Sequence, residues 1–380
     1  MPISNSLASI IPVIFAQGLS ALRNKCVMPS LCNVSYAPLA AEKGQIITIP
    51  IPSAITTADV APAAYAPDSG NLAPTVAQIT LNHWREAAFT LTENEIAQAA
   101  NGYPAKQATA AISALADYVN STIFAKYTKF YSAVGSAGTA PFATTVNAAV
   151  DAKELLTMQK APSNDRRMVL DTTAMGNALK LGAFAYILNS NDPGVMKEGE
   201  IGRKYGFDWF EDQQVPYHTS TPLTAGAATV NGAHAAGATS ISIAKATNPS
   251  PLVAGDIVTF AGDTQQYVVT ANATLVVGNT SVVLYPGLAT AKSGGEAMTL
   301  VASHRVNLAF QADAFGFVSR TLAHVAGAEP NPYSMELADP VSGLTLRLQV
   351  REEFHRIRWA FDMLWGVDVV RPELGTRVLG

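Results

Sequence analysis

The stretch that decides the fold is residues 103–134, which read YPAKQATAAISALADYVNSTIFAKYTKFYSAV. Seven apolar residues in it recur at spacings of three and four, which is typical of one buried helix face: Ala108, Ile112, Leu115, Val119, Ile123, Tyr127 and Phe130. Pro104 suits the first turn of a helix, and Gly135 suits the left-handed residue that ends one. We predict a single helix, roughly 45 Å long at about 1.5 Å per residue, that forms the spine of the molecule.

The composition indicates that much of the monomer's surface is shielded from water by other molecules or by attached groups. Only 14% of the residues are charged and 48% are hydrophobic, whereas about a quarter of a typical chain is charged. A membrane, identical subunits or attached glycans could shield the surface in this way. No apolar run reaches the ~20 residues of a membrane span, because Pro12 and several polar residues interrupt residues 7–22. Residues 1–6 lack a basic leader, so we also expect no signal peptide and predict a cytoplasmic product.

Charge and cysteine content narrow the function further. The net charge of −4 argues against a protein that binds nucleic acid by neutralising its phosphates. Weak contact with nucleic acid is compatible with this charge. Cys26 and Cys32 are too few for a disulfide framework and are not spaced as CxxC. We therefore expect two reduced thiols.

The part of the chain before the spine is predicted to be an arm and a long two-stranded loop. Residues 4–25 carry apolar side chains at helical spacing and predict an amphipathic arm. Residues 45–52 and 76–91 predict strands. Residues 53–77 are rich in Ala, Pro, Asp and Gly, which predicts a long loop between them.

Helices and strands alternate after the spine. Residues 147–160 and 172–188 predict two helices, and Asp171 is the expected N-cap of the second. Residues 166–170 predict a short buried strand. Residues 194–219, rich in glycine and aromatic side chains, are predicted to be a loop.

The composition changes sharply in residues 221–302, which contain only five charged residues. Six short alternating runs, punctuated by glycine turn signals, predict strands there: 239–245, 256–261, 266–271, 273–277, 280–285 and 297–301. Six strands in so short a segment indicate a small closed or nearly closed β domain. Because mixed α/β sequence flanks it on both sides, we predict an insertion.

The C-terminal part is predicted to be strands at residues 343–350, 355–361 and 364–370, with a tail at 371–380. The densest basic cluster lies there: Arg347, Arg351, Arg356 and Arg358. We interpret it as a sheet face with ion pairs to Glu352, Glu353 or a neighbouring subunit. Contact with an anion or with nucleic acid is the alternative.

A second group of candidate contact residues lies on the long loop and its returning strand: Asp59, Tyr65, Asp68, Trp84, Arg85 and Glu86. A long polar arm costs chain entropy that a monomer has no visible way to recover. We therefore predict that these six residues, with the four arginines, contact other subunits.

No pattern in the sequence indicates catalysis, a metal or a cofactor. The six histidines are scattered, without a second ligand at metal spacing. Residues 135–138 do not match the GxSxG motif, and the glycines at 199, 202 and 206 do not match GxGxxG. We predict that the chain is not an enzyme.

Short segments carry a resemblance that extends over nearly the whole chain: Gly199-Glu200-Ile201-Gly202, Gly206-Phe207-Asp208, Val215-Pro216, residues 255–262 (GDIVTFAG), Ile357-Arg358-Trp359, residues 364–367 (LWGV) and Arg371-Pro372-Glu373. With the order of the predicted parts, they resemble the major capsid proteins of tailed double-stranded-DNA bacteriophages, which have the Hong Kong 97-type fold. More narrowly, they are similar to the coat proteins of short-tailed Salmonella phages, which carry an inserted β-barrel.

The resemblance implies an α+β chain with an inserted all-β barrel domain. It divides the chain as follows: N-terminal arm 1–40, extended loop and flanking strands 41–100, spine helix of the peripheral domain 101–145, axial domain 146–220, barrel 221–302, second part of the axial domain 303–342, and peripheral strands with the tail 343–380.

The resemblance also implies a structural role. Such subunits form the hexamers and pentamers of an icosahedral virion shell, assembled in the host cytoplasm around the genome. The partners it implies are other copies, a scaffolding protein, a portal protein and a decoration protein, with weak non-specific DNA contact, no membrane and no cofactor. Alternatives are an encapsulin-like compartment, a surface-layer or adhesin protein, and a secreted hydrolase.

Overall fold

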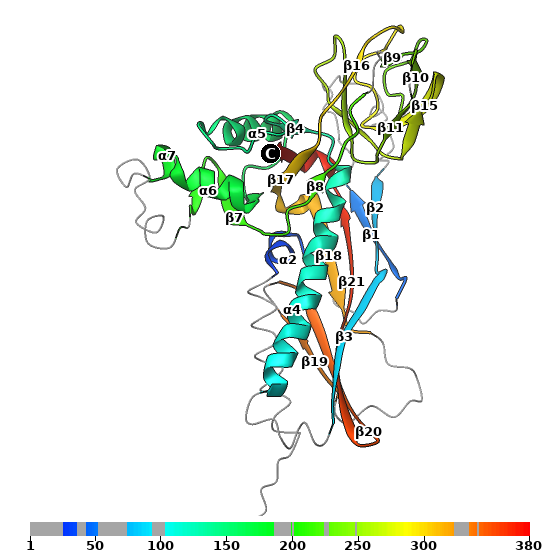
Figure 1. The fold of residues 1–380 in the computed structure, drawn as a ribbon. Coiled ribbons are helices and arrows are strands. Elements are labelled where there is room, and N and C mark those ends of the chain that lie inside the picture. The colour runs from blue at the N-terminus through cyan, green and yellow to red at the C-terminus, as the bar shows by residue number, and fades with distance from the viewer. Residues whose placement is uncertain are drawn as a thin grey trace, which may run out of the picture.

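The computed structural model describes residues 26–35, 43–51, 74–92, 103–185, 199, 201–223, 228–247, 249–322, 334–339 and 342–380. Among the described residues, three sheets of five to seven strands follow one another along an elongated molecule, and a long helix runs beside the lowest of them (Figure 1). Within these ranges, no helix combines the length and apolarity that crossing a membrane requires. The predicted arm at 4–25 and most of the predicted loop at 53–77 lie outside the described residues.

The spine helix α4 spans Tyr103–Phe124 and continues as the 3-10 helix η1, Ala125–Lys129. The predicted apolar stripe is confirmed, because its members from Ala108 to Ile123 are buried. The predicted helix end at residue 134 is wrong. Phe130 takes an extended conformation, and its ring packs against Phe315, so the chain turns into the short strand β4, Ala133–Val134. The short helix α2, Val27–Leu31, packs against α4.

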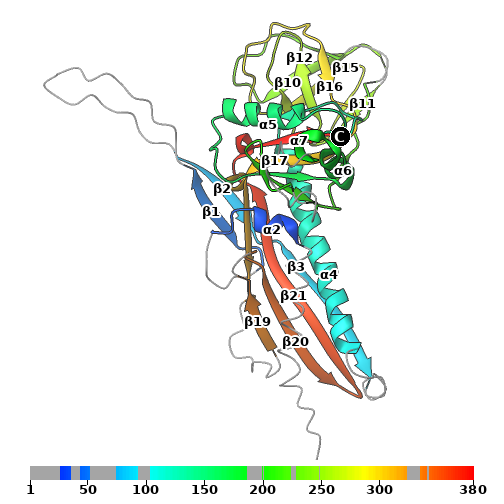
Figure 2. The ribbon, with the colours of Figure 1, turned by 90° about the vertical axis from the view of Figure 1, so that its left-hand side faces the viewer.

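The lower sheet lies beside α4 (Figures 1 and 2). Its strands are β3 (His83–Thr92), β18 (Phe315–Arg320), β19 (Ser334–Ala338), β20 (Thr345–Glu353) and β21 (Arg356–Val369). β21 pairs with β3, β18 and β20. The two strands predicted at 355–361 and 364–370 are therefore one strand of 14 residues.

A hairpin of β1, Ile46–Ile51, and β2, Thr75–Thr80, covers the upper part of the lower sheet. Ile49 and Ile79 pack with Leu364 in a small core. The prediction of a single strand at 76–91 is wrong, because Leu81 and Asn82 belong to no strand and separate β2 from β3. β2 then pairs with β1, and β3 pairs with β21.

A second sheet of seven strands forms the middle of the molecule, in the order β4-β22-β17-β5-β7-β6, with β8 pairing β17. Its further strands are β5 (Arg166–Leu170), β6 (Arg203–Lys204), β7 (Phe207–Glu211), β8 (Tyr217–His218), β17 (His304–Gln311) and β22 (Gly375–Leu379). Helices α5 (Asn147–Met158), α6 (Thr172–Lys180) and α7 (Gly182–Ala185) accompany it, and the 3-10 turns η2 (Ala312–Ala314) and η3 (Pro372–Leu374) connect it to the lower sheet.

Several predictions for this sheet and its helices are confirmed and three are wrong. The single helix predicted at 172–188 is interrupted, because Leu181 takes an extended conformation between α6 and α7. Strand β5 has the predicted bounds, and the Asp171 carboxylate caps α6 by accepting from the backbone N–H groups of Thr173 and Ala174. The predicted loop at 194–219 contains strand β7, whose Phe207 and Trp209 are buried. The predicted C-terminal tail contains β22, which pairs with β4 along one edge and with β17 along the other, and all five of its residues are buried.

The third sheet, called here the six-stranded unit, occupies residues 228–300 at the end of the molecule beyond the seven-stranded sheet (Figure 1). Its strands are, in spatial order, β16 (Met298–Leu300), β12 (Ile257–Phe260), β13 (Tyr267–Val269), β15 (Gly278–Tyr285), β10 (Ser240–Lys245) and β9 (Ala228–Val230). All six predicted strands are present. The three-residue strands β9 and β11 (Ser250–Leu252) were not predicted, and β11 pairs with β14 (Ala273–Leu275). The Val230 backbone bonds to Gly295 and Glu296, so the sheet is nearly closed.

Candidate assembly surface

The lower sheet has two faces of different character. Side chains at Trp359, Phe361 and Trp365 pack on the face that α4 covers. Because side chains alternate along a strand and register partners share a face, the opposite face carries the next set of residues. We call this second set the open face: Trp84 and Glu86 on β3; Arg347, Gln349, Arg351 and Glu353 on β20; Arg358, Ala360 and Asp362 on β21.

A buried ion pair lies at the centre of the open face. The Arg347 guanidinium donates two hydrogen bonds to the Asp362 carboxylate, one from Nε at 2.8 Å and one from Nη2. The Trp84 indole N–H donates to the same carboxylate at 3.1 Å. The hydrogen bonds to Asp362 raise the pKa of Arg347 above its ordinary value. This pair therefore fixes β20, β21 and β3 in one register.

Two exposed ion pairs lie further along the face, between Arg358 and Glu86 and between Arg356 and Glu353. Exposed pairs of this kind contribute about 0 to 1 kcal/mol each to stability. A pocket of about 160 Å³ opens between them, lined by Glu86, Gln349, Arg351, Glu353, Arg358 and Ala360. Within the described part of the chain, Arg351 forms no ion pair. Its exposed guanidinium is therefore available to a carboxylate from another molecule.

Exposed aromatic side chains border the charged residues. Phe354, in the turn between β20 and β21, is 89% exposed, and Trp84 is 45% exposed. An aromatic ring exposed to this extent beside arginines is typical of a protein–protein contact. The face can thus offer both apolar area and charge to a partner.

The structure separates some of the residues that the sequence grouped together. Trp84 and Glu86 lie on the open face, but Arg85 lies on the other face, where its guanidinium donates to the Tyr118 hydroxyl at 2.9 Å. The predicted contact residues Asp59, Tyr65 and Asp68 lie outside the described residues. Asp362 was not predicted, although a single acid within the apolar run WAFDMLW was a signal that could have identified it.

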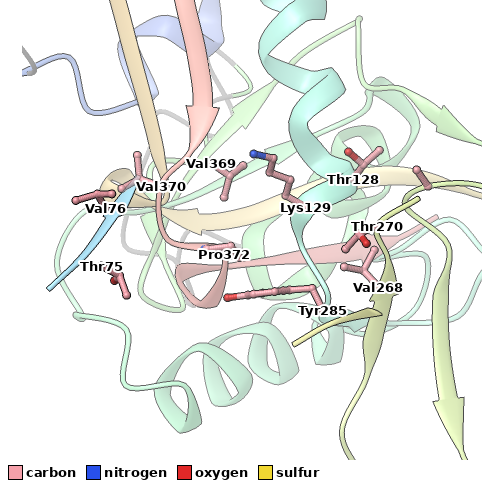
Figure 3. A pocket seen from close by; sticks show the side chains of 11 residues that line it. Thr75, Val76, Thr128, Lys129, Val268, Thr270, Tyr285, Val369, Val370 and Pro372 are labelled. Atoms are coloured by element: carbon pink, nitrogen blue, oxygen red, sulfur yellow. The ribbon is translucent and has the colours of Figure 1, made fainter. Parts of the chain in front are cut away.

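A larger pocket, of about 560 Å³, lies between the six-stranded unit, η1 and the end of β21 (Figure 3). Its lining is mainly apolar and hydroxyl-bearing: Thr75, Val76, Thr128, Lys129, Ala254, Val268, Thr270, Tyr285, Val369, Val370 and Pro372. The one amine in this lining, on Lys129, is 2.7 Å from Asp368. The pocket contains no pairing of nucleophile and base. Among the described residues, no cluster of histidine, cysteine and acidic side chains is suited to a metal ion.

Comparison with solved structures identifies the fold. A chain in a structure of Mycobacterium phage Che8 aligns with 93% of this chain and 91% of its own length, at a TM-score of 0.52 and 14% identity. A chain in the capsid structure of the cyanophage P-SCSP1u aligns with 93% of this chain and 88% of its own length, at a TM-score of 0.52 and 13% identity. The chain has a phage coat fold of the Hong Kong 97 type. No protein-family model matches the sequence, and no curated protein matches it.

In this fold the open face belongs to the sheet that packs on the spine helix α4. Identities of 13% and 14% establish the fold alone. The arrangement is suited to binding protein surfaces.

Proposed function

We propose that this chain is a major capsid protein of a tailed phage, which assembles into hexamers and pentamers that enclose a double-stranded DNA genome. The observation that carries the proposal is the match over 93% of the chain to a chain of a cyanophage capsid. Low charge content supports it, because surface buried between subunits need not be solvated and obligate interfaces are large and apolar. The protein would then reside in the virion after assembly in the host cytoplasm.

The finer assignments follow from the same proposal. The six-stranded unit would be an inserted barrel domain like that of the short-tailed Salmonella phage coat proteins, between the two parts of the axial domain at 146–220 and 303–342. Residues 101–145 and 343–380 would form the peripheral domain, residues 1–40 the arm and 41–100 the extended loop. Scaffolding, portal and decoration proteins would be its further partners, and its contact with DNA would be weak.

Electron microscopy of the purified protein tests the proposal. Negative-stain images across a concentration series should show closed shells or tubes tens of nanometres wide, and a scaffold candidate should increase the yield of closed shells. Shells that enclose nucleic acid support a virion, whereas shells that enclose protein cargo support the encapsulin-like alternative. Monomers at every concentration, with and without the scaffold candidate, would contradict both.

We further propose that the open face contacts a neighbouring subunit, with Arg351 and Arg358 binding its carboxylates. Arg358→Glu places three acids together with Glu86 and Glu353, so the protein concentration needed for assembly should rise at least about tenfold, equivalent to ~1.4 kcal/mol. Arg203→Glu is the matched control, because Arg203 is also an exposed, ion-paired arginine, with a side chain 51% exposed against 43% for Arg358. Equal effects of both variants, at unchanged circular dichroism, would refute the contact.

A further inference from the structure

Five polar side chains from five segments meet where the six-stranded unit joins the seven-stranded sheet. They are Tyr127 on η1, His218 on β8, Asp256 just before β12, His304 on β17 and Arg377 on β22, and we call them the junction cluster. The last four are 2% exposed or less. A buried set of ionisable groups drawn from so many segments is costly to desolvate, so each group must be compensated by its neighbours.

His218 connects the two parts of the molecule. Its Nε2 lies 2.9 Å from the Asp256 carboxylate, and its Nδ1 lies 2.8 Å from the Tyr127 hydroxyl. The other oxygen of Asp256 accepts from the Val253 backbone N–H at 2.7 Å. A neutral imidazole satisfies both contacts, since Nε2–H donates to the carboxylate while Nδ1 accepts from the tyrosine. The six-stranded unit, which supplies Asp256, is thus hydrogen-bonded to the spine through His218.

Arg377 supplies the positive charge that compensates Asp256. Its Nη1 donates to the Gly255 carbonyl at 2.6 Å, and its guanidinium lies 5.0 Å from the centre of the Tyr127 ring. Burial lowers the pKa of Arg377 to about 9, so the group stays charged at neutral pH. Gly255 itself has φ +100°, and a Cβ there would lie 2.9 Å from Cγ2 of Thr128. The unit therefore packs on η1 with no space for an extra atom.

His304 lies next to Asp256 and Arg377, whose opposite charges compensate each other. Its Nδ1–H donates to the Ala302 carbonyl at 2.8 Å, and its ring centre lies 5.4 Å from that of His218. Its Nε2 is buried and has no hydrogen-bond partner in the described part of the chain. A proton on Nε2 would create a donor without an acceptor and a second cation near Arg377. Burial, together with the positive charge of Arg377, lowers the pKa of His304 to about 4, against the opposing effects of the Ala302 hydrogen bond and of Asp256.

We propose that the junction cluster is a proton-operated latch, which fixes the six-stranded unit on the body at neutral pH and releases it when His304 takes up a proton. In the closed junction Nε2 has no acceptor among the described residues, whereas in an opened junction water accepts its hydrogen bond. Acid therefore favours the open state. This inference concerns a single subunit and does not depend on the proposed assembly.

The sign and size of the effect follow from linkage. His304 has its ordinary pKa of 6.5 when it reaches water and about 4 in the closed junction. The closed state is fully favoured above pH 6.5, and this advantage is lost as the pH falls from 6.5 toward 4. Between pH 7.5 and pH 5.0 the equilibrium constant for opening should rise by about 30-fold.

Hydrogen–deuterium exchange of the full-length protein at these two pH values, corrected for intrinsic exchange rates, tests the latch. Peptides that cover residues 253–258, 302–306 and 375–380 should show the 30-fold rise. His304→Asn keeps an amide donor for Ala302 but cannot titrate, so it should abolish the pH response. His355→Asn is the control, since His355 is exposed and outside the cluster, and it should retain the response.

A second variant and three refuting outcomes complete the test of the latch. If His304→Asn fails to fold, Arg377→Met serves instead, because removing the neighbouring cation should bring the pKa of His304 closer to 6.5 and shrink the response. Equal protection of the junction peptides at both pH values in the wild-type protein would overturn the latch. So would a full response in His304→Asn, or an unchanged response in Arg377→Met.

Discussion

Replacing Arg347 by methionine removes one partner of the buried ion pair at the centre of the open face. The side chains of Arg347 and Asp362 are each 10% exposed. After the substitution, Asp362 keeps the hydrogen bond from the Trp84 indole N–H, at 3.1 Å. Breaking a buried pair in this way costs about 3 to 5 kcal/mol, because the remaining charge is uncompensated. Since some water reaches this pair, we expect a loss near the lower limit, about 3 kcal/mol.

Urea denaturation followed by tryptophan fluorescence measures this loss. Three of the four tryptophans, Trp84, Trp359 and Trp365, lie on β3 and β21, so their fluorescence reports on the lower sheet. Arg347→Met and Asp362→Leu should each be destabilising, whereas the double variant should recover most of the loss, because no lone charge remains. A loss below about 1 kcal/mol for Arg347→Met would refute the reasoning. A double-variant loss equal to the sum of the single losses would refute it as well.

Further predictions concern packing and thiol chemistry. Gly366→Ala would place a Cβ 2.5 Å from the Thr80 carbonyl oxygen, so the hairpin should be displaced and stability should fall by about 1 to 3 kcal/mol, measured by denaturation and by hydrogen exchange in β1 and β2. Gly176→Ala is the control and should not destabilise, because an added Cβ there would have no described atom within 4 Å apart from its chain neighbours and the backbone of its own helix. Burial raises the pKa of both Cys26 and Cys32 to about 12, so native protein at pH 8 should resist iodoacetamide and unfolded protein should react. Rapid labelling of the native thiols would contradict this.

Sequence patterns identified those elements whose residues have one buried and one exposed face. The apolar stripe of α4 and the alternation in the six-stranded unit are patterns of this kind, and both are confirmed. Strand β22 could not be identified in this way, because all five of its residues are buried and no alternation is left in the sequence. The end of α4 was misplaced because Phe130 is buried, as the stripe requires, yet packs against Phe315 from an extended backbone.

The sequence predicted which arginines lie on the candidate surface, but it did not predict which acidic residue each of them contacts. The sequence indicated an arginine cluster with acidic partners, and the Arg356–Glu353 pair is of the kind expected from neighbouring residues. Arg358 instead contacts Glu86, which lies 272 positions away in the sequence. That contact depends on the register between β3 and β21, which arises from the packing of the whole sheet. No local pattern in either strand specifies it.

The small number of charged residues is best understood from where they lie. Lys129 on η1 contacts Asp368 on β21 across 239 positions of sequence, and Lys292 forms a pair with Asp263 in which each side chain is only 4% exposed. Both pairs join separate segments of the chain, but only the second is removed from the outer surface, since the Lys129 side chain is 47% exposed. With only 14% of its residues charged, the chain nevertheless has few charges to place on its outer surface. A surface of that kind suits a subunit that buries much of it against other copies, because desolvating apolar area is favourable whereas desolvating charge is costly.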